Sequence, residues 1–307
     1  MGAIMASADF VVVDYAGEYA KLEQRTRMDW SGVLDALYYV PLAQEEQRHF
    51  QLRREYAQLI AARSASAKKA MKALVARLVP VVFRNGQNPE LIQDLIRPMT
   101  DALFGELLGA AVPKVASEGP SPSQIFDRFL GLNRRKKMQD RVALLKEAFA
   151  TQTLATSPEH GTALLIVGYD SLAGSLGSSL VAILRRGEGL RLCDMDRPDV
   201  LPSTGVPYVE RVAARDCRIR GIDVRAGERI RLFLDACPAT RKDSQHASFF
   251  GRGRHICLGQ DLSQCSWRIL VRELAKIPLK VRIVEATLRQ HDYVFSAYDS
   301  VRVSVYE

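Results

Sequence analysis

The sequence predicts a mainly α-helical protein with small β-sheets, and three observations lead to that prediction. Long segments with the composition or periodicity of helices occupy much of residues 44–186, and one more follows Gly259. Short stretches in which apolar and polar residues alternate, as in strands, lie mainly in the last third of the chain. The 307 residues are 47% hydrophobic and 25% charged, which fits a soluble globular protein. We expect a single domain over residues 1–307 and leave the fold of residues 1–43 open.

The predicted helices rest on composition and on apolar spacing. Residues 44–78 contain no Gly and no Pro and are rich in strong helix formers. Residues 123–153 are predicted helical with a break near Gly131, and 161–186 begins with an apolar run that is typical of a buried helix. The segment 91–109 repeats apolar residues on one face, at Leu91, Leu95, Met99, Leu103 and Leu107.

Five stretches predict strands. Residues 10–13 form a short apolar run near the start. Residues 222–224 and 230–234 alternate around a glycine turn, and this pattern predicts that they pair as a hairpin. Valines and isoleucines that alternate with charges predict two terminal strands, near residues 281–283 and 301–305.

Charge and cysteine usage narrow the class of protein. The net charge of +8 suits nucleic acid, an acidic membrane surface or an acidic protein partner, but no nucleic-acid fingerprint is present, and the run Arg134–Lys137 is interpreted as a solvated helix start. The five cysteines are odd in number and lack Cys-x-x-Cys spacing, which argues against a zinc ribbon and a disulfide framework. The apolar runs predict no transmembrane segment, and the start has no clear signal peptide. We therefore expect a cytoplasmic protein.

The most informative stretch lies just before the last predicted helix. Cys257 sits in a glycine-rich turn, where unpaired backbone N–H groups and the positive end of the helix dipole favour a thiolate. Glycines there permit positive φ and a close approach to something flat or bulky. Six positions within ten residues define the pattern: Phe250, Gly251, Gly253, His255, Cys257 and Gly259.

This pattern, Phe-Gly-x-Gly-x-His-x-Cys-x-Gly, resembles the heme-ligand loop of the cytochrome P-450 family. The resemblance implies that Cys257 is the axial thiolate to the iron of heme b (iron protoporphyrin IX) and that Phe250 shields the sulfur. A thiolate ligand pushes electron density onto the iron and favours O–O cleavage. An isolated cysteine ahead of a helix would otherwise be interpreted as a small buried residue.

Two other segments resemble the parts of the family that bind the heme carboxylates. His49 and Arg53 are four residues apart, so they share one face of the predicted helix and resemble the family's segment that holds a heme propionate. Arg211, near the start of a predicted strand pair, takes the place of another propionate-binding arginine, and the resemblance gives His255 the same role. Two cations on one face suit a carboxylate, although an exposed surface pair is the alternative for His49 and Arg53.

The segment 161–186 resembles the family's long central helix, which crosses the heme. There the resemblance implies that Gly168 makes room for dioxygen and that Asp170 and Ser171 relay protons, with serine in place of the commoner threonine. A carboxylate inside an apolar helix is costly unless it has a partner or a function. The alternative interpretation is a polar kink in which Asp170 caps the backbone locally.

The resemblance covers roughly residues 44–307, with gaps. It implies a trimmed cytochrome P-450 fold that lacks most of the N-terminal sheet region, much of the two helices after the central one, and most of the meander before the heme loop. Glu188 and Arg191 have the spacing of the family's Glu-x-x-Arg pair but lie between glycines, so whether they form it stays open.

The resemblance implies oxidation of a small organic molecule, with dioxygen and an external electron donor or with peroxide. A redox-neutral heme-thiolate reaction and a non-catalytic heme-binding protein are the alternatives. Arg252, Arg254 and Arg268 lie close to Cys257 in sequence, and together with the positive net charge they lead us to expect an acidic ferredoxin as donor.

Overall fold

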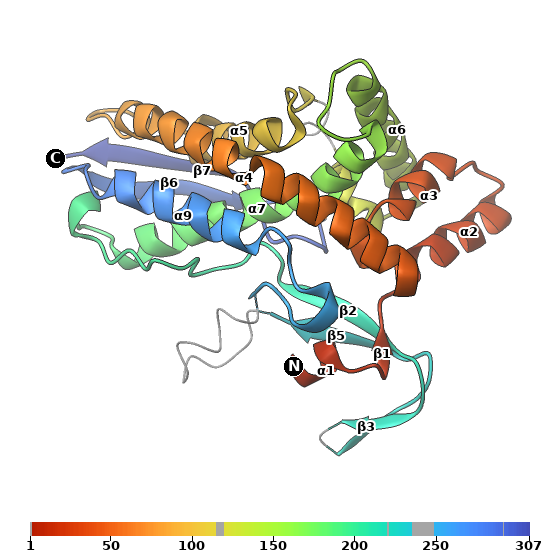
Figure 1. The fold of residues 1–307 in the computed structure, drawn as a ribbon. Helices are drawn as coiled ribbons and strands as arrows, with labels where there is room; N and C mark the ends of the chain where they lie inside the picture. Colours follow the sequence, from red (N-terminus) through yellow and green to blue (C-terminus); the bar gives the residue numbers. More distant parts are fainter. Residues whose placement is uncertain (1, 115–119, 220, 235–248, 291) are drawn as a thin grey trace.

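The computed structural model describes residues 2–114, 120–219, 221–234, 249–290 and 292–307. A body of long helices is accompanied by small antiparallel sheets (Figure 1). The helices are α1 (Gly2–Ala6), α2 (Tyr15–Thr26), α3 (Ser31–Tyr38), α4 (Glu46–Val82), α5 (Arg97–Leu108), α6 (Leu132–Ala150), α7 (Pro158–Arg186) and α9 (Gln260–Leu274). Short 3-10 turns occupy Pro41–Ala43, Pro122–Phe126, Leu192–Asp194 and Gly253–His255, and a π-turn, Ile92–Ile96, leads into α5.

Most of the expected helices are confirmed. The segments 44–78, 91–109 and 161–186 correspond to α4, to the π-turn with α5, and to α7. The segment 123–153 is a 3-10 turn followed by α6, and Gly131 is the N-cap of α6, so the expected break is real. These segments are predictable because their apolar residues repeat at the helical period and are buried where the helices meet.

Helix α7 runs through the middle of the helical body (Figure 1). It is long and apolar enough to cross a membrane by length and composition, but 61% of its apolar window is buried inside the fold. Its N-terminus is capped by Ser157, whose side chain accepts a hydrogen bond from the His160 backbone N–H. The burial is that of a core helix, which other helices surround and which therefore needs little polar surface.

The strands form three small antiparallel sheets. The first has the order β1 (Phe10–Val11), β2 (Tyr208–Ala213), β5 (Arg229–Phe233). The second pairs β3 (Cys217–Ile219) with β4 (Ile222–Val224) and projects from the body in Figure 1. The third pairs β6 (Lys280–Leu288) with β7 (Tyr298–Tyr306), which confirms the two expected terminal strands.

The expected hairpin between 222–224 and 230–234 is wrong. The strands exist, but β4 pairs with β3 and β5 pairs with β2. Gly221 has φ +87° in the short connection between β3 and β4, which lets the chain reverse before Gly227 is reached. Alternation identifies a strand, whereas its partner depends on which turn closes first and on which long-range neighbour is available.

A glycine contact joins the segment before β2 to the centre of α7. A Cβ at Gly205 would lie 2.6 Å from the Ser175 backbone nitrogen and 2.7 Å from the Gly174 carbonyl carbon. Gly205 also accepts a 2.8 Å hydrogen bond from the Ser296 backbone N–H and donates its own to Ser175 Oγ at 2.8 Å. Two backbones therefore meet here with no room for a side chain.

We expect Gly205→Ala to destabilise the fold by about 1–3 kcal/mol, because neither backbone can move aside without losing these hydrogen bonds. The free energy of unfolding in denaturant measures this. Gly32→Ala is the matched control, since its new Cβ would meet only Gln139 Cγ at 3.8 Å and alanine favours the helix. Equal stability of the Gly205→Ala variant and the wild type would contradict the close contact.

Candidate active site

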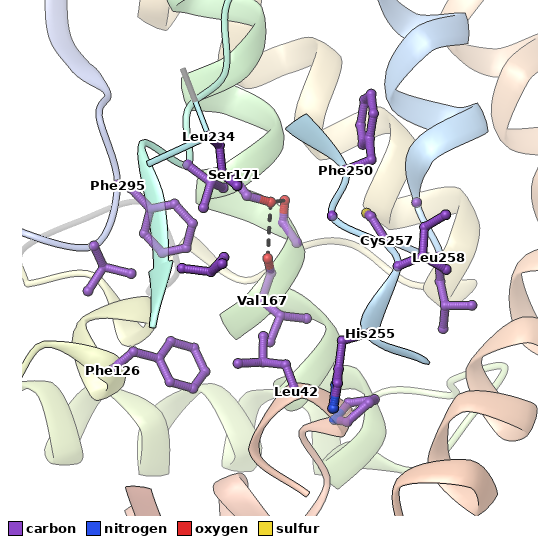
Figure 2. A pocket seen from close by; sticks show the side chains of 18 of the residues that line it. Leu42, Phe126, Val167, Ser171, Leu234, Phe250, His255, Cys257, Leu258 and Phe295 are labelled. Carbon is purple, nitrogen blue, oxygen red and sulfur yellow. Dashed lines mark hydrogen bonds between the residues drawn. The ribbon is translucent and has the colours of Figure 1, made fainter. Parts of the chain in front are cut away.

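A cavity of about 340 Å³ lies between α7 and the loop that precedes α9. Figure 2 shows Cys257, Leu258 and Phe250 on the loop side and Ser171 and Val167 of α7 across from them. The walls are mostly apolar, with Leu42, Leu103, Phe126, Leu164, Leu234, Val294 and Phe295 among the lining residues. An apolar cavity with a few converging polar groups is typical of a small-molecule or cofactor site.

The glycine-rich loop has the backbone that its sequence predicts. Gly251 and Gly253 have φ of +70° and +72°, a region that favours glycine. A Cβ at Gly253 would lie 3.0 Å from Ala6 Cα, so α1 packs directly on the loop. The Cys257 N–H donates a 2.8 Å hydrogen bond to the Phe250 carbonyl, which closes the loop, and α9 begins three residues later at Gln260. The thiol is thereby fixed ahead of a helix N-terminus.

The surroundings of Cys257 shift the pKa of its thiol in opposite directions. Burial raises the pKa of the thiol, while the Gly259 backbone N–H and the charge of Arg53 lower it. The residue keeps exposed surface because it lies on the cavity wall, although protein surrounds it on its other sides. In the absence of a ligand, burial dominates and favours the neutral thiol; a bound metal ion would supply the positive charge that a thiolate needs there.

Two imidazoles lie in contact beside the loop. The rings of His49 and His255 have centroids 4.2 Å apart and are tilted by 46°, and both side chains are buried. Burial, with neighbouring cations, lowers the pKa of His49 to about 4 and that of His255 to about 3. Both ring nitrogens of His49 and Nε2 of His255 are buried with no hydrogen-bond partner among the described residues. A neutral imidazole has one N–H donor, and a buried donor without an acceptor costs about 1–3 kcal/mol, so an acceptor on a bound molecule would stabilise the His49 N–H.

Two arginines that the sequence analysis named lie near these rings. Both contribute to the low pKa of His255. Arg53 Nη1 donates a 2.8 Å hydrogen bond to the Ile256 carbonyl, and Arg211 Nη1 donates one of 2.7 Å to the Glu210 carbonyl. Each bond uses one nitrogen of a group with five N–H donors, which leaves donors for an anion. The structure therefore brings His49, Arg53, Arg211 and His255 into one cluster.

Glu45 belongs to the same cluster and was missed by sequence reasoning. Its Oε1 accepts a 2.8 Å hydrogen bond from the Val12 N–H, and its Oε2 lies 3.2 Å from Arg254 Nη2 and 3.8 Å from His255 Nε2. It also acts on Arg211 electrostatically. No sequence signal marks it, because its importance comes from chain segments that are 209 and 210 residues away along the sequence.

The residues of the cluster fit a heme. Unpaired imidazole nitrogens and two arginines suit the two carboxylates of the cofactor, and the Cys257 thiol suits its iron. His49, Arg53, Arg211 and His255 would hold the propionates, and Cys257 would be the iron ligand. Glycines 251, 253 and 259 would give the loop its shape, and Phe250 lies on the same wall of the cavity.

The central helix presents only part of its polar motif to this cavity. Gly168 and Ser171 line it, and Ser171 Oγ lies 3.0 Å from both the Val167 and the Gly168 carbonyl oxygens, as the dashed lines of Figure 2 show. A Cβ at Gly168 would come within 2.7 Å of Phe104 Cζ, so this position has no room for one unless Phe104 moves.

Asp170 lies on a different face of α7. Its Oδ2 accepts hydrogen bonds from Ser121 and, at 2.8 Å, from Ser123, and its Oδ1 pairs with Arg289 Nη1 at 3.2 Å. Asp170 and Ser171 are consecutive in a helix and so differ by about 100° in direction. The structure therefore places Ser171 on the cavity wall and holds Asp170 in a separate polar cluster.

Asp127 is a second residue that sequence reasoning missed. It lines the cavity, its Oδ1 accepts a 2.8 Å hydrogen bond from the Phe129 N–H, and its Oδ2 is buried with no partner among the residues described. Asp127 as a whole is 2% exposed, so its unpaired carboxylate oxygen is removed from water. A donor on a bound molecule would offset this desolvation cost. Nothing in the local sequence separates it from an ordinary turn aspartate.

The segment after α7 does not provide a helical Glu-x-x-Arg pair at Glu188 and Arg191. Both lie in an exposed connection between α7 and the 3-10 turn Leu192–Asp194, and Arg191 makes a backbone bridge to Lys280. The stretch that would contain the meander, 235–248, lies outside the described residues, as does the start of the loop at His246. In the described part of the chain, no helix lies between Asp194 and β2.

The chain is similar in sequence to known proteins. No family model matches the chain. It is 25% identical over 299 residues to the mycinamicin IV hydroxylase/epoxidase of Micromonospora griseorubida, covering 81% of this chain and 75% of that protein. It is 25% identical over 173 residues to the biotin biosynthesis cytochrome P450 of Bacillus subtilis, covering 48% of this chain and 43% of that protein.

Solved structures show the same fold. The crystal structure of CalO2 has a TM-score of 0.79 at 17% identity, covering 99% of this chain and 88% of that one. The structure of P450BioI, solved with an acyl carrier protein that carries hexadec-9Z-enoic acid, has a TM-score of 0.74 at 18% identity, covering 99% and 89%. The fold, mainly α with small sheets, is thus the cytochrome P450 fold.

The chain therefore resembles cytochrome P450 proteins both in sequence, at 25% identity, and in fold. This resemblance supports an enzyme of the P450 monooxygenase type. The resemblance that the loop at Cys257 predicted is thereby confirmed.

The buried imidazoles generate a prediction about pH. Because the pKa of His49 is lowered from 6.5 to about 4, the unfolded chain binds more protons than the folded chain between these values. The free energy of unfolding of the heme-free protein should therefore fall as pH drops from 6.5 towards 4. His49→Gln should reduce this dependence and leave the part due to His255, whose pKa is also lowered. Denaturant unfolding at several pH values measures it. Bound heme should reduce the slope in the wild type, and an unchanged slope in His49→Gln would contradict the prediction.

Proposed function

We propose that the protein oxidises a small, largely apolar organic molecule, using dioxygen and electrons from an external donor, or using peroxide. The observation that carries the proposal is the position of the Cys257 thiol on a cavity wall that faces Gly168 and Ser171 of α7. Heme b, held as described above, would supply the oxygen chemistry when bound, and the protein supplies position, exclusion of water and protons.

The cavity walls favour an apolar substrate. Val167, Phe126 and Phe295 surround the space next to Ser171 in Figure 2. Bulky apolar side chains exclude water and hold a hydrocarbon skeleton by burial of its surface, at roughly 25 cal/mol per Å². Asp127 offers one carboxylate oxygen to a donor group on the substrate, such as a hydroxyl or an amine, and this contact would orient the molecule.

Proton delivery is assigned to Ser171 and Asp170. Ser171 Oγ, held between two backbone carbonyls of α7, is the hydroxyl that borders the cavity. Asp170 is the carboxylate next to Ser171 in the sequence, and its two serine partners and Arg289 hold it in place. A proton would pass to the cavity only through Ser171 or an intervening water, because the Asp170 carboxylate contacts the serine and arginine cluster and does not line the cavity.

Two other functions remain alternatives because of specific observations. The separation of Asp170 from the cavity and the lack of a helical Glu188/Arg191 pair favour a redox-neutral heme-thiolate reaction or a heme-binding protein without turnover. The serine at position 171 and the apolar cavity support oxygen chemistry instead. Consumption of a reduced donor in the presence of oxygen separates these functions.

We further propose a cytoplasmic protein with an acidic ferredoxin as electron donor. Arg252 is exposed beside the cysteine loop, whereas Arg254 is engaged with Glu45 and Arg268 lies 4.0 Å from Asp261. Exposed cations near the heme would increase the association rate of an acidic partner by steering.

Replacement of Cys257 tests heme ligation. The reduced carbon monoxide complex of the wild type should show the strongly red-shifted Soret band typical of a thiolate ligand, and Cys257→Ala should lose it. Cys193→Ala, Cys217→Ala and Cys265→Ala are controls that should keep the band; Cys237, which lies outside the described residues, is a fourth. The same band in Cys257→Ala would refute thiolate ligation by this residue.

The role of Asp170 is tested by Asp170→Asn. Loss of the charge that faces Arg289 should destabilise the protein by about 1–3 kcal/mol and slow oxygen-dependent turnover, or divert it to peroxide. Asp299→Asn is the control, because Asp299 also pairs with Arg289 but is half exposed and distant from Ser171 in the chain. Turnover that is equally affected in both variants would mean that Asp170 acts only through the stability of the cluster.

Electron transfer should depend on charge at Arg252. Reduction by an acidic ferredoxin should slow as salt rises, because exposed charges are screened beyond roughly 10 Å at 0.1 M. It should also slow in Arg252→Glu, without loss of heme. Arg25→Glu makes the same change on the exposed side of α2, away from α9 in Figure 1, and should leave the rate unchanged. Equal rates in the two variants would point to peroxide or to redox-neutral chemistry.

A further inference from the structure

A second cavity, of about 490 Å³, lies beside α7 on the face that carries Asp170. Tyr169, Asp170, Ala173 and Gly174 of α7 contribute to its wall, while Ser171 and Gly168 line the first cavity. The remaining wall comes from the start of α5, the segment 120–124, the start of α6 and the segments that join β6 to β7. Its lining is rich in charged and amide groups, in contrast to the apolar cavity at Cys257.

Four cations line this second cavity: Arg97, Arg134, Lys137 and Arg289. Arg289 is occupied, since it contacts Asp170 at 3.2 Å, Asp292 at 3.4 Å and Asp299 at 3.1 Å. Arg134 and Lys137 differ, because neither has a carboxylate within ion-pair distance in the described part of the chain. Asp170 and Asp299 are the only carboxylates among the described lining residues, so the wall carries an excess of positive charge.

Arg134 carries an unsatisfied donor. Its Nε is buried with no hydrogen-bond partner among the described residues, and its Nη2 makes only a long 3.4 Å contact to Gln124 Oε1. A buried donor of a charged group without an acceptor is costly. The sequence indicates a solvated helix start at 134–137, and Lys136 and Lys137 are indeed exposed near the start of α6. Arg134 and Lys137, one helical turn apart, also line the cavity.

The start of the helix that presents these two cations carries no negative charge. Helix α6 has no acidic residue in its first turn, and Gly131 offers no side-chain cap. Its sequence instead places Arg134, Arg135, Lys136 and Lys137 near the end where the helix dipole is positive. Arg135 donates hydrogen bonds to the Tyr19 hydroxyl and to backbone carbonyls, whereas Arg134 and Lys137 have no carboxylate partner among the described residues.

We propose that the second cavity is a binding site for a small oxyanion, whose phosphate or carboxylate group contacts Arg134 and Lys137. A guanidinium fork matches the oxygens of either group, and a lysine adds a point charge. The cavity is large enough for a molecule of several such groups. The proposal does not depend on the oxidation chemistry of the first cavity.

The test uses the heme-loaded protein with pyrophosphate and citrate as probes, and sodium chloride at the same ionic strength as reference. Calorimetric titration should show saturable binding of at least one probe, and the melting temperature should rise with its concentration. Preference for pyrophosphate indicates a phosphate ligand, and preference for citrate a carboxylate ligand. Arg134→Gln with Lys137→Gln should weaken binding at least tenfold.

Lys136→Gln is the matched control, because it removes an adjacent positive charge from the same helix at a residue that does not line the cavity. It should bind as the wild type does. Lys137→Gln alone changes an exposed side chain and tests the site if the double variant fails to fold. No saturable binding of either probe, binding that chloride competes away at equal ionic strength, or equal weakening in Lys136→Gln would overturn the proposal.

Discussion

The site depends on one constraint: a buried cluster of imidazoles and arginines whose free N–H donors can bind an anion. His49 and His255 lie in contact, with ring nitrogens that lack partners among the described residues, and Arg53 and Arg211 lie close by. Burial keeps both imidazoles neutral, as their low pKa values show. Such a cluster costs folding free energy unless carboxylates enter it. The heme propionates would therefore stabilise the fold as well as be held by it.

Glu45 lowers the folding cost of this cluster. Its carboxylate already contacts Arg254 and lies near His255, so it supplies a negative charge inside the cluster before any cofactor binds. A propionate would have to share these cations with Glu45. The protein thus avoids the full cost of an uncompensated basic cluster, and the affinity for heme reflects the difference between the two partners.

Helix α7 separates two environments of opposite character. One face, with Gly168 and Ser171, borders the apolar cavity at Cys257, and another face, with Asp170, borders the basic second cavity. Helix α7 is buried because α5, α6 and the terminal sheet pack against it. The loop at Cys257 is supported separately, by the α1 contact at Gly253 and by α9.

The sequence by itself determined the helices after residue 43, the terminal strands and the loop that carries Cys257, because each is encoded by spacing within a few residues of the chain. It also placed His49 and Arg53 on one helix face, which follows from the 3.6-residue period. It did not determine the helices α1, α2 and α3 of residues 1–43. The tertiary structure decided which strands pair, since alternation does not specify a partner. It decided that Asp170 and Ser171 face different cavities, and that Glu45 and Asp127 join the site. Such facts depend on segments brought together from distant parts of the chain, and local periodicity contains no information about which neighbour a face will meet.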